Sequence, residues 1–289
     1  MTGLRSTRSA GSDDVWRNTA APATHNRIRV GVGGWTFAPW RSNFYPATLV
    51  QRRELEYASR QLTAIEINGT YYGTQKPETY AKWAAQTPPG FVFSAKAPRR
   101  IMQSRVLAKT QGQVVDFLGG IAALGDRLGP IVWQFDKGTH IERDDFAAFV
   151  ELLPSSSEGR ALRHVLDVRD PFFVDRAYLD LARRHGMATV FTDSAVHPSF
   201  ADVTADFVYA RLMQSRPDLA SGYEGVDLQQ WAKRALAWAQ GGEPEDLPKV
   251  AADATAPSQP RDVFVYFISA AKERNPAAAM ALIEQLGTG

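Results

Sequence analysis

The sequence has no cysteine and no long apolar run, and its charges nearly cancel. Without cysteine, disulfides, thiolate metal sites and thiol nucleophiles are excluded. No apolar run approaches the roughly 20 residues that cross a bilayer, so we expect no membrane partner. A formal net charge of +2 over 289 residues is too small to indicate nucleic-acid or membrane binding by itself. We therefore expect a cytoplasmic protein.

Composition also predicts how the chain is divided. Residues 1–26 are rich in Ser, Thr, Ala and Arg and have neither periodicity nor the apolar centre of a signal peptide, which predicts a disordered tail. The remainder suits one large domain, 27–289. Within it, 241–261 is rich in Pro, Ala and Asp and is non-periodic, which predicts a flexible insertion.

A repeating strand–helix pattern fills the domain. Short runs rich in Val, Ile, Phe and Tyr predict strands at 28–34, 64–68, 92–96, 130–135, 164–169, 188–193, 207–212 and 263–268. Helical patterns follow at 48–61, 77–86, 109–127, 143–153, 174–185, 226–240 and 276–286, and 194–206 lacks one. Eight such units over about 260 residues predict a single parallel TIM-type (β/α)₈ barrel, an α/β fold.

An open doubly wound sheet is the competing arrangement. Such a sheet usually carries a glycine-rich phosphate turn after its first strand. Here VGVGGW (30–35) has glycines but not the GxGxxG spacing, and bulky Phe37, Pro39 and Trp40 follow. The sequence therefore argues against a dinucleotide site and favours the closed barrel.

Polar side chains end six consecutive predicted strands. Alternation along each strand points one set of residues into the barrel, and active sites of such barrels lie at the carboxyl ends of the strands. The inward residues at those ends are predicted to be Glu66, Asn68, Ser94, Lys96, Gln134, Asp167, Arg169, Asp193, Tyr209 and Arg211. We expect them to form one polar ring at the mouth.

The residue types in the ring indicate two kinds of chemistry. Lys96, Arg169 and Arg211 could bind a phosphate, sulfate or carboxylate group. Carboxylates held near like charge serve as general acids or bases, and the candidates are Glu66, Asp167 and Asp193. Asn68, Gln134, Trp35 and Tyr71 would complete the substrate contacts. The same charges would also balance one another in a purely structural ring.

Metal ligands are scarce. The carboxylates could hold a hard divalent ion through oxygen, but the chain has five histidines and His197 alone follows a strand at the predicted mouth. We assign no metal ligand and require no cofactor, and leave a divalent metal open.

Five segments resemble the YecE-like family, domain of unknown function 72. They read GVGGWTFAPWRSNFYP (31–46), IEINGTYYGTQKPETYAKWAAQTPPGFVFSAKAPRRI (65–101), LGPIVWQF (128–135), LDVRDPFF (166–173) and VYARL (208–212). The resemblance covers about residues 28–286 and implies a TIM-barrel fold and a site, but no particular reaction. It places the family's signature positions on Gly34, Trp35, Glu66, Asn68, Tyr71 and Lys96.

Two motifs depart from the family pattern. The Glu-x-Arg-His of the fifth strand appears as Asp167, Arg169 and Asp170. After the eighth strand, paired asparagines and a Gly-His-Ala are replaced in YFISAAKERNPAAA (266–279). These departures indicate a divergent member with a changed or lost activity.

Three hypotheses follow for function. The leading one is an enzyme that acts on a small phosphorylated or otherwise anionic substrate by carboxylate acid/base chemistry. The second is a non-catalytic module that binds an anionic metabolite or a nucleic-acid end. The third is a metal-dependent, nuclease-like barrel. The basic stretch KAPRRIMQSR (96–105) reads as a solvated loop, so nucleic acid is not favoured.

Overall fold

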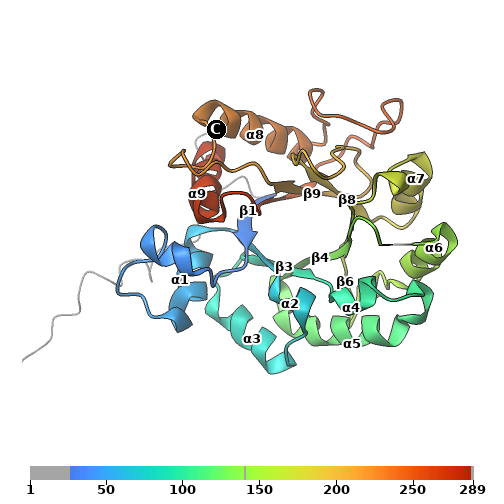
Figure 1. The fold of residues 1–289 in the computed structure, drawn as a ribbon, viewed down its shortest axis with the longest axis horizontal. Coiled ribbons are helices and arrows are strands. Elements are labelled where there is room, and N and C mark those ends of the chain that lie inside the picture. Colours follow the sequence, from blue (N-terminus) through green and yellow to red (C-terminus); the bar gives the residue numbers. More distant parts are fainter. Residues whose placement is uncertain (1–26, 140, 288–289) are drawn as a thin grey trace, which may run out of the picture.

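A computed structural model describes residues 27–139 and 141–287 of the chain. Eight parallel strands close into a barrel in the order β1-β10-β9-β8-β7-β4-β3-β2 (Figure 1). They are β1 (Ile28–Gly33), β2 (Ala64–Ile67), β3 (Val92–Lys96), β4 (Leu128–Phe135), β7 (His164–Val168), β8 (Ala188–Thr192), β9 (Phe207–Leu212) and β10 (Asp262–Phe267). The predicted TIM-type barrel is confirmed, and the tail predicted over 1–26 lies outside the described residues.

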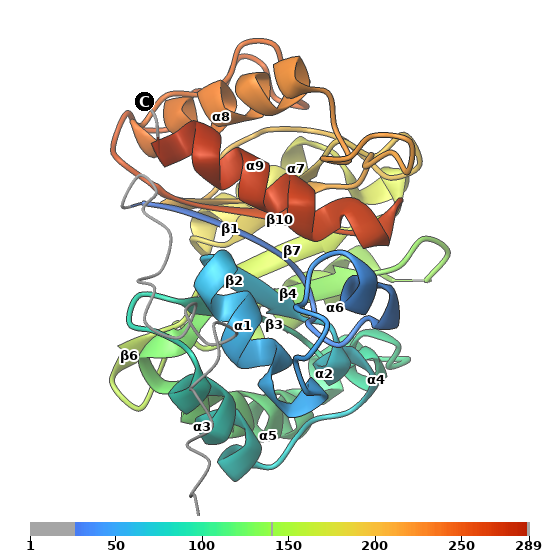
Figure 2. The same ribbon diagram turned by 90° about the vertical axis from the view of Figure 1, so that its left-hand side faces the viewer.

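Helices surround the barrel. They are α1 (Glu54–Gln61), α2 (Gly69–Tyr72), α3 (Pro77–Gln86), α4 (Arg99–Met102), α5 (Gln111–Ile121), α6 (Arg143–Leu152), α7 (Arg176–Arg184), α8 (Gly225–Ala239) and α9 (Asn275–Gly287). The last two lie side by side against β10, on one flank of the barrel (Figure 2). Local chemistry fixes where two other helices begin. Pro77 is the first residue of α3, and the Asp175 carboxylate caps the amino end of α7 by accepting from the amide of Tyr178 at 2.9 Å.

Each predicted strand agrees with an observed one to within two residues, and the predicted long helices are present. The segment 194–206 carries no helix or strand, as expected. The 3₁₀ turns η3 (Gln51–Arg53) and η5 (Ala122–Arg127) lie within the predicted helices 48–61 and 109–127. The sequence did not predict the other short elements, which are α2, α4, the hairpin of β5 (Ser156–Ser157) and β6 (Arg160–Ala161), and the 3₁₀ turns η2 (Ala38–Ser42), η4 (Leu107–Lys109), η6 (Pro171–Phe173) and η7 (Lys272–Arg274). Such short pieces contain too few residues for a periodic pattern.

Alternation along the strands divides the apolar core into two layers. One layer lies between strands and helices and contains, for example, Ile65, Ile67 and Phe93. The other fills the barrel interior with Ala64, Val132, Val165, Ala188, Val190, Phe207, Tyr209, Phe264 and Tyr266. Because side chains two apart share a face, the polar residues that continue this inner series rise above it at the carboxyl ends of the strands.

Two glycines of β1 shape the barrel interior. A Cβ on Gly31 would lie 1.9 Å from the carbonyl oxygen of Ala64, and one on Gly33 would lie 2.5 Å from Nδ2 of Asn68. Glycine is therefore required at Gly31, where the backbones of β1 and β2 approach each other, while the Asn68 amide occupies the space beside Gly33. β1 thus contributes no side chain to the barrel interior at either position.

The segment 241–261 has no helix or strand, in agreement with its composition. It is nonetheless held by polar contacts. The Asp202 carboxylate accepts from the amides of Val250 at 2.7 Å and Ala251 at 2.9 Å, and Arg261 donates to the carbonyl of Gly242 at 3.0 Å. The flexibility of this insertion stays a prediction. Within 27–139 and 141–287, no helix combines the length and apolar character that crossing a membrane requires.

Candidate active site in the barrel mouth

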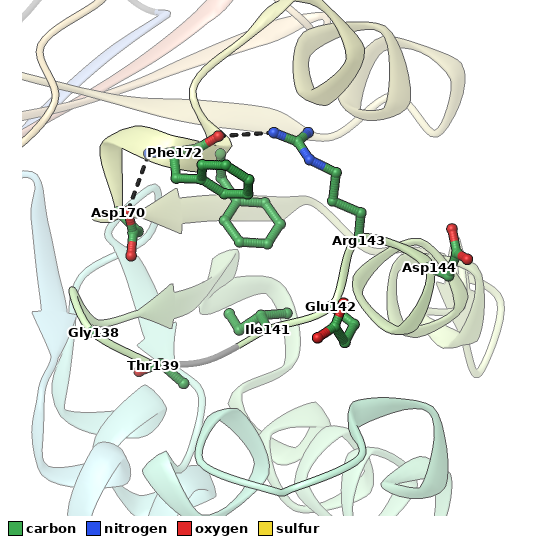
Figure 3. Close-up of a pocket in the computed structure, with 9 residues that line it drawn as sticks. Gly138, Thr139, Ile141, Glu142, Arg143, Asp144, Asp170 and Phe172 are labelled. Atoms are coloured by element: carbon green, nitrogen blue, oxygen red, sulfur yellow. Dashed lines mark hydrogen bonds between the residues drawn. The ribbon is translucent and has the colours of Figure 1, made fainter.

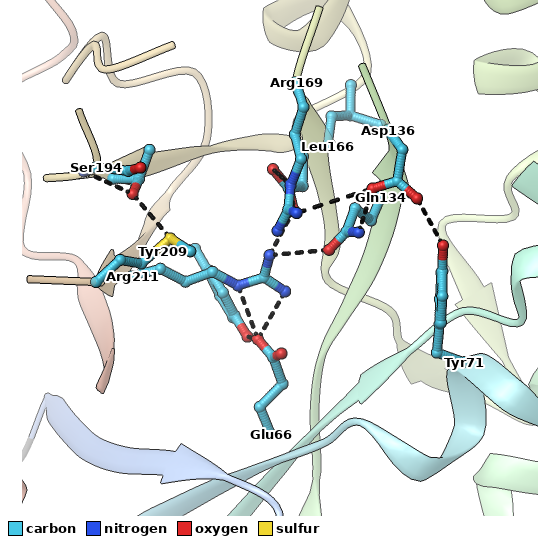
Figure 4. A network of polar contacts seen from close by, with 12 residues as sticks. Glu66, Tyr71, Gln134, Asp136, Leu166, Arg169, Ser194, Tyr209 and Arg211 are labelled. Atoms are coloured by element: carbon cyan, nitrogen blue, oxygen red, sulfur yellow. Dashed lines mark hydrogen bonds and ion pairs between the residues drawn. The ribbon is translucent and has the colours of Figure 1, made fainter. Parts of the chain in front are cut away.

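The Arg211 guanidinium is the centre of a buried ion cluster (Figure 4). Its Nε and Nη2 donate to Oε2 of Glu66 at 3.0 and 2.9 Å. Its Nη1 donates to Oδ2 of Asp167 and, at 3.4 Å, to Oε1 of Gln134. The side chains of Arg211 and Glu66 are 2% and 1% exposed. All three guanidinium nitrogens are therefore used within the protein, and Arg211 positions two carboxylates.

Strand register explains why these residues meet. Gln134 pairs with Asp167 across β4 and β7, and Arg211 pairs with Tyr266 across β9 and β10. Each is an inward position near the carboxyl end of its strand, so the side chains converge over the apolar layer. The predicted convergence of Glu66, Gln134, Asp167 and Arg211 is thus built by the barrel itself.

Two tyrosines form the floor beneath the cluster. The Tyr209 hydroxyl donates to Oε2 of Glu66 at 2.5 Å, and the Tyr266 hydroxyl lies 2.6 Å from Oγ of Ser94. Burial raises the pKa of both phenols well above the usual range. Both therefore keep their protons and act as hydrogen-bond donors or acceptors rather than as bases.

The two oxygens of Glu66 differ sharply. Oε2 accepts from Tyr209 and twice from Arg211. Oε1 is buried and has no hydrogen-bond partner in the described part of the chain. A buried polar atom without a partner costs free energy, and such atoms concentrate at functional sites. Oε1 therefore marks the point of the cluster that can accept a bond from a ligand.

A second, more exposed set of contacts surrounds Asp136, just beyond β4. Its Oδ1 accepts from Nε2 of Gln134 at 2.6 Å and its Oδ2 from the Tyr71 hydroxyl at 2.7 Å. The Arg169 guanidinium lies 3.8 Å from Asp136 and 3.2 Å from Asp167. Burial, with the bond to Asp136, raises the pKa of Tyr71 to about 12. Tyr71 is thus a fixed donor at neutral pH.

The charges around Asp167 decide its protonation state. Burial alone would raise the pKa of this carboxyl, but Arg211, Arg169 and Lys96 outweigh burial and lower it. Asp167 is therefore an anion at neutral pH, with both oxygens contacted by Arg169.

Unlike Arg169 and Arg211, Lys96 forms no ion pair with a carboxylate of the described residues. Among the described residues, no carboxylate oxygen lies within 4.0 Å of its ammonium, which instead lies 4.2 Å from the centroid of the Tyr71 ring. Burial, followed by the charge of Arg211, lowers the pKa of Lys96 to about 8. Its charge thus changes closer to neutral pH than that of an ordinary lysine.

These residues line a cavity of about 320 Å³, here called the barrel-mouth cavity. Its walls are Gly33, Glu66, Asn68, Tyr71, Tyr72, Lys96, Gln134, Arg169, Arg211, Ile268, Ser269, Lys272 and Asn275. Ser269 and the adjacent Ala270 have φ of 64° and 46°. Consecutive left-handed residues that are not glycine are uncommon and cluster at functional sites.

Most of the predicted site residues meet in this cavity: Glu66, Asn68, Tyr71, Lys96, Gln134, Arg169 and Arg211. Asp167 lies against Arg211 and Arg169.

Two residues differ from the prediction. Asp193 follows the inward Thr192 by one residue and turns out of the lumen into a neighbouring cavity, where its carboxylate accepts from the Met213 amide at 2.5 Å and the Tyr223 hydroxyl at 3.2 Å.

Trp35 also lies elsewhere. Its ring packs edge-on against Trp83 at 4.9 Å and tilts against Phe93 at 6.1 Å, on the helix side of the barrel. The turn at Gly34, with φ of 76°, directs the chain there. In this position Trp35 anchors the first loop to α3 rather than contacting the barrel-mouth cavity.

The sequence did not predict Asp136, Ser269, Lys272 or Asn275 as members of the site. Asp136 follows the fourth strand by one residue, and continuing the inward series Val132, Gln134 would have found it. Lys272 and Ser269 follow the last strand in a region with no periodic signal. His197 lies in the loop after β8, where the charges of Arg169 and Asp167 act on it. Its Nδ1 is buried without a partner in the described residues, and burial, then Arg169, lowers its pKa, so the ring is neutral.

In the described ranges, no three His, Asp or Glu side chains gather in a way that could hold a metal ion.

A larger cavity of about 590 Å³ lies between α6 and the turn after β7 (Figure 3). Its lining includes Arg143, Asp170 and Phe172. The Arg143 guanidinium donates to the Phe172 carbonyl at 2.8 Å and pairs with Asp175 at 2.9 Å, while the Asp170 carboxylate accepts from the Phe172 amide at 3.0 Å. The charges of Arg143 and Asp170 therefore serve the local fold, whereas the barrel-mouth cavity contains a buried carboxylate oxygen without a partner in the described residues.

Fold and site together define an eight-stranded parallel α/β barrel with a polar cavity at the carboxyl ends of its strands. The chain belongs to the family described as protein of unknown function DUF72, whose model matches residues 29–289, and this confirms the resemblance found in the sequence.

Relatives and solved structures agree with this assignment. The chain is 28% identical to UPF0759 protein YecE of Escherichia coli O157:H7 over 184 residues, which are 56% of this chain and 64% of that protein. The match to its counterpart from strain K12 is also 28% identical, over 35% of each chain. The matched part therefore spans less than two thirds of these curated relatives.

Two crystal structures of DUF72 family proteins share the fold. The one from Thermotoga maritima MSB8 has a TM-score of 0.68 at 18% identity, covering 91% of this chain and 99% of that one. The one from Enterococcus faecalis V583 has a TM-score of 0.64 at 15% identity, covering 91% and 96%. At such identities the likeness establishes the fold alone.

Proposed function

We propose that the chain is an enzyme that binds a small phosphorylated or otherwise anionic molecule in the barrel-mouth cavity and moves a proton on it through Glu66. One observation carries the proposal: the cavity holds lysines that lack a carboxylate partner and a buried carboxylate oxygen that lacks a donor, counting all described residues. Both arrangements cost free energy in the free protein, and a suitable ligand would offset that cost.

The anion would be held by the two lysines. Lys96 lies at the end of β3, and Lys272 lies across the mouth with its ammonium 4.4 Å from the Phe37 ring centroid. Arg169 forms ion pairs with Asp167 and Asp136, and all the guanidinium nitrogens of Arg211 donate hydrogen bonds within the protein. The two arginines would therefore tune the electrostatic potential and fix the carboxylates, while the lysines supply the charges that an anion needs.

Proton transfer would centre on Glu66. Its Oε2 is fixed by Arg211 and Tyr209, so Oε1 keeps one orientation and can accept a proton from a bound molecule. Lys96, with a pKa near 8, is the cavity group that can supply a proton close to neutral pH. Asp167 would hold Arg211 in place. A volume of about 320 Å³ suits a molecule of metabolite size.

Thermal denaturation with inorganic phosphate tests the binding step. Phosphate should raise the melting temperature of the wild-type protein by mass action, and the shift should shrink above pH 8 as Lys96 loses its proton. Lys96→Met should abolish most of the shift, whereas Lys82→Met, an exposed lysine on α3, should leave it unchanged. Equal shifts in all three proteins, or with sodium chloride at matched ionic strength, would indicate a general salt effect.

A screen of sugar phosphates and phosphorylated keto and hydroxy acids, followed by mass spectrometry, tests turnover. Glu66→Asp keeps the charge beside Arg211 but withdraws the carboxylate by one methylene. It should retain phosphate binding and lose turnover of any consumed compound by about 100-fold or more, the usual value of general acid–base catalysis. Unchanged turnover in this variant would remove Glu66 from the chemistry.

A further inference from the structure

Lys96 has the surroundings of a lysine that can act as a nucleophile. It ends β3, lines the barrel-mouth cavity and is only partly exposed. The Tyr71 ring lies 4.2 Å from its ammonium, and no carboxylate of the described residues approaches within 4.0 Å. A structural lysine in such a place is usually paired with an acid. Lys96 therefore keeps its amine available to the cavity.

The surroundings of Lys96 favour its neutral form. Burial, then the charges of Arg211 and Arg169, lower its pKa to about 8, and together they outweigh Glu66 and Asp167, which act in the opposite direction. Lysines that form covalent adducts are activated in the same two ways, by desolvation and by a neighbouring cation. At pH 7.5 a substantial fraction of Lys96 would thus carry the free lone pair that a nucleophile needs.

We infer that Lys96 forms an imine with the carbonyl carbon of a small anionic aldehyde or ketone held in the barrel-mouth cavity. This deepens the proposed function and rests on it. Lys272 would hold the anionic end, and Lys96, which binds an anion in its charged form, would react with the carbonyl in its neutral form. The chain supplies the three required parts in one cavity: a nucleophilic amine, a cation for the anionic group, and a carboxylate oxygen without a donor.

The step balances with the groups present. The Nζ lone pair of Lys96 forms a bond to the carbonyl carbon, and the π pair of the carbonyl moves to its oxygen. Oε1 of Glu66 carries the two amine protons in turn to that oxygen, which leaves as one water molecule. A C=N bond remains, and no oxidant, reductant or metal is consumed. The imine then withdraws electrons from the neighbouring carbon, which suits proton transfer or C–C bond chemistry there.

Reductive trapping tests this inference. The full-length protein is incubated with pyruvate or dihydroxyacetone phosphate and sodium cyanoborohydride, and is analysed by intact mass and peptide mapping. We expect one adduct, equal to the probe less one oxygen, on the peptide that contains Lys96. Adduct formation should rise about tenfold per pH unit at low pH and level off near pH 8. An ordinary lysine would show no such plateau.

Variants sharpen the result. Lys96→Arg keeps a cation but cannot form an imine, and should lose the adduct. Lys272→Met should lower the yield without moving its position. An adduct on Lys272, labelling spread over surface lysines, or no adduct with either probe would overturn the inference. If phosphate still stabilises the protein through Lys96, the proposed function survives that outcome. If phosphate does not, both fail.

Discussion

The two ends of the barrel both carry charged side chains, but they use them differently. At the amino end, Arg163 pairs with Asp262 at 2.6 Å, and their side chains are 39% and 30% exposed. The Arg163 guanidinium also covers the rings of Phe207 and Phe264, at 5.6 and 5.7 Å. At the carboxyl end, Arg211 and Glu66 form a pair that water hardly reaches.

The difference shows what distinguishes a site from a structural plug. The amino-end pair is hydrated, closes over aromatic rings and is complete in itself. The carboxyl-end cluster is buried, borders a cavity and, in the described residues, contains both a donor-less oxygen and an unpaired lysine. Charged residues at strand ends are thus common to both ends, while incomplete pairing in a cavity is what indicates a ligand.

The largest expected effect is the difference in stability between two variants, each of which breaks an ion pair at one end of the barrel. Glu66→Gln leaves the Arg211 cation buried with less compensation, so the free energy of unfolding should fall by about 3–5 kcal/mol. Asp262→Asn breaks the partly hydrated pairs with Arg163 and Arg27 and should cost about 1 kcal/mol. Urea denaturation of both variants measures the contrast. Similar losses in the free energy of unfolding for the two variants would mean that burial does not distinguish the two ion pairs.

A second variant should increase stability. Lys96 is charged below pH 8 in both folded and unfolded chains, and its folded-state cost is then fully present. Lys96→Met removes that cost and should raise the free energy of unfolding at pH 7 by about 1–3 kcal/mol. Because the pKa rises from about 8 to 10.5 on unfolding, the gain should disappear between these pH values.

Arg163→Met provides the matched control at the amino end. Its cation is paired and partly hydrated, so its removal should destabilise the protein slightly and without a transition at pH 8. Denaturation of both variants at pH 7 and pH 10 makes the comparison. A loss of stability in Lys96→Met would show that the ammonium is better compensated than its contacts indicate.

The smallest effect concerns Asp193, a carboxylate at the carboxyl end that lies outside the ion cluster. Burial raises its pKa from 3.8 to about 6, so the folded chain binds more protons than the unfolded chain between these values. Its contribution to stability should therefore fall by about 2 kcal/mol as the pH rises from 4 to 6. Asp193→Asn should remove this decline, whereas Asp116→Asn, on the exposed face of α5, should retain it. Unchanged pH profiles in both variants would contradict the assignment.

The strands and their inward faces could be predicted because each rests on a local, two-residue alternation. That rule placed Glu66, Lys96 and Arg211 in one mouth. It missed the orientation of Asp193, because a strand that ends at Thr192 no longer alternates. It also could not tell that Arg211 is fully engaged while Lys96 is not. Hydrogen-bond partners depend on distances between strands, which no local pattern contains.

Loops were harder still. Lys272 follows a strand in a segment where neither period applies, and Trp35 leaves the mouth because Gly34 turns the chain. The left-handed Ser269 and Ala270 carry no sequence signal of that conformation, since such residues adopt it only when the surrounding structure enforces it. Side chains on regular strands were therefore predictable, and those on loops were not.

The ion cluster can assemble only late in the synthesis of the protein. Glu66 finds its donors 143 and 145 residues further along the chain, in Tyr209 and Arg211. At typical rates of translation, roughly 10–30 s separate the carboxylate from its partners. During that interval Glu66 stays hydrated, and the strands already made cannot seal around it. The ion cluster can form only after β9 has left the ribosome, and the barrel closes only after β10, which pairs with both β9 and β1. Such late, long-range pairing favours slow folding.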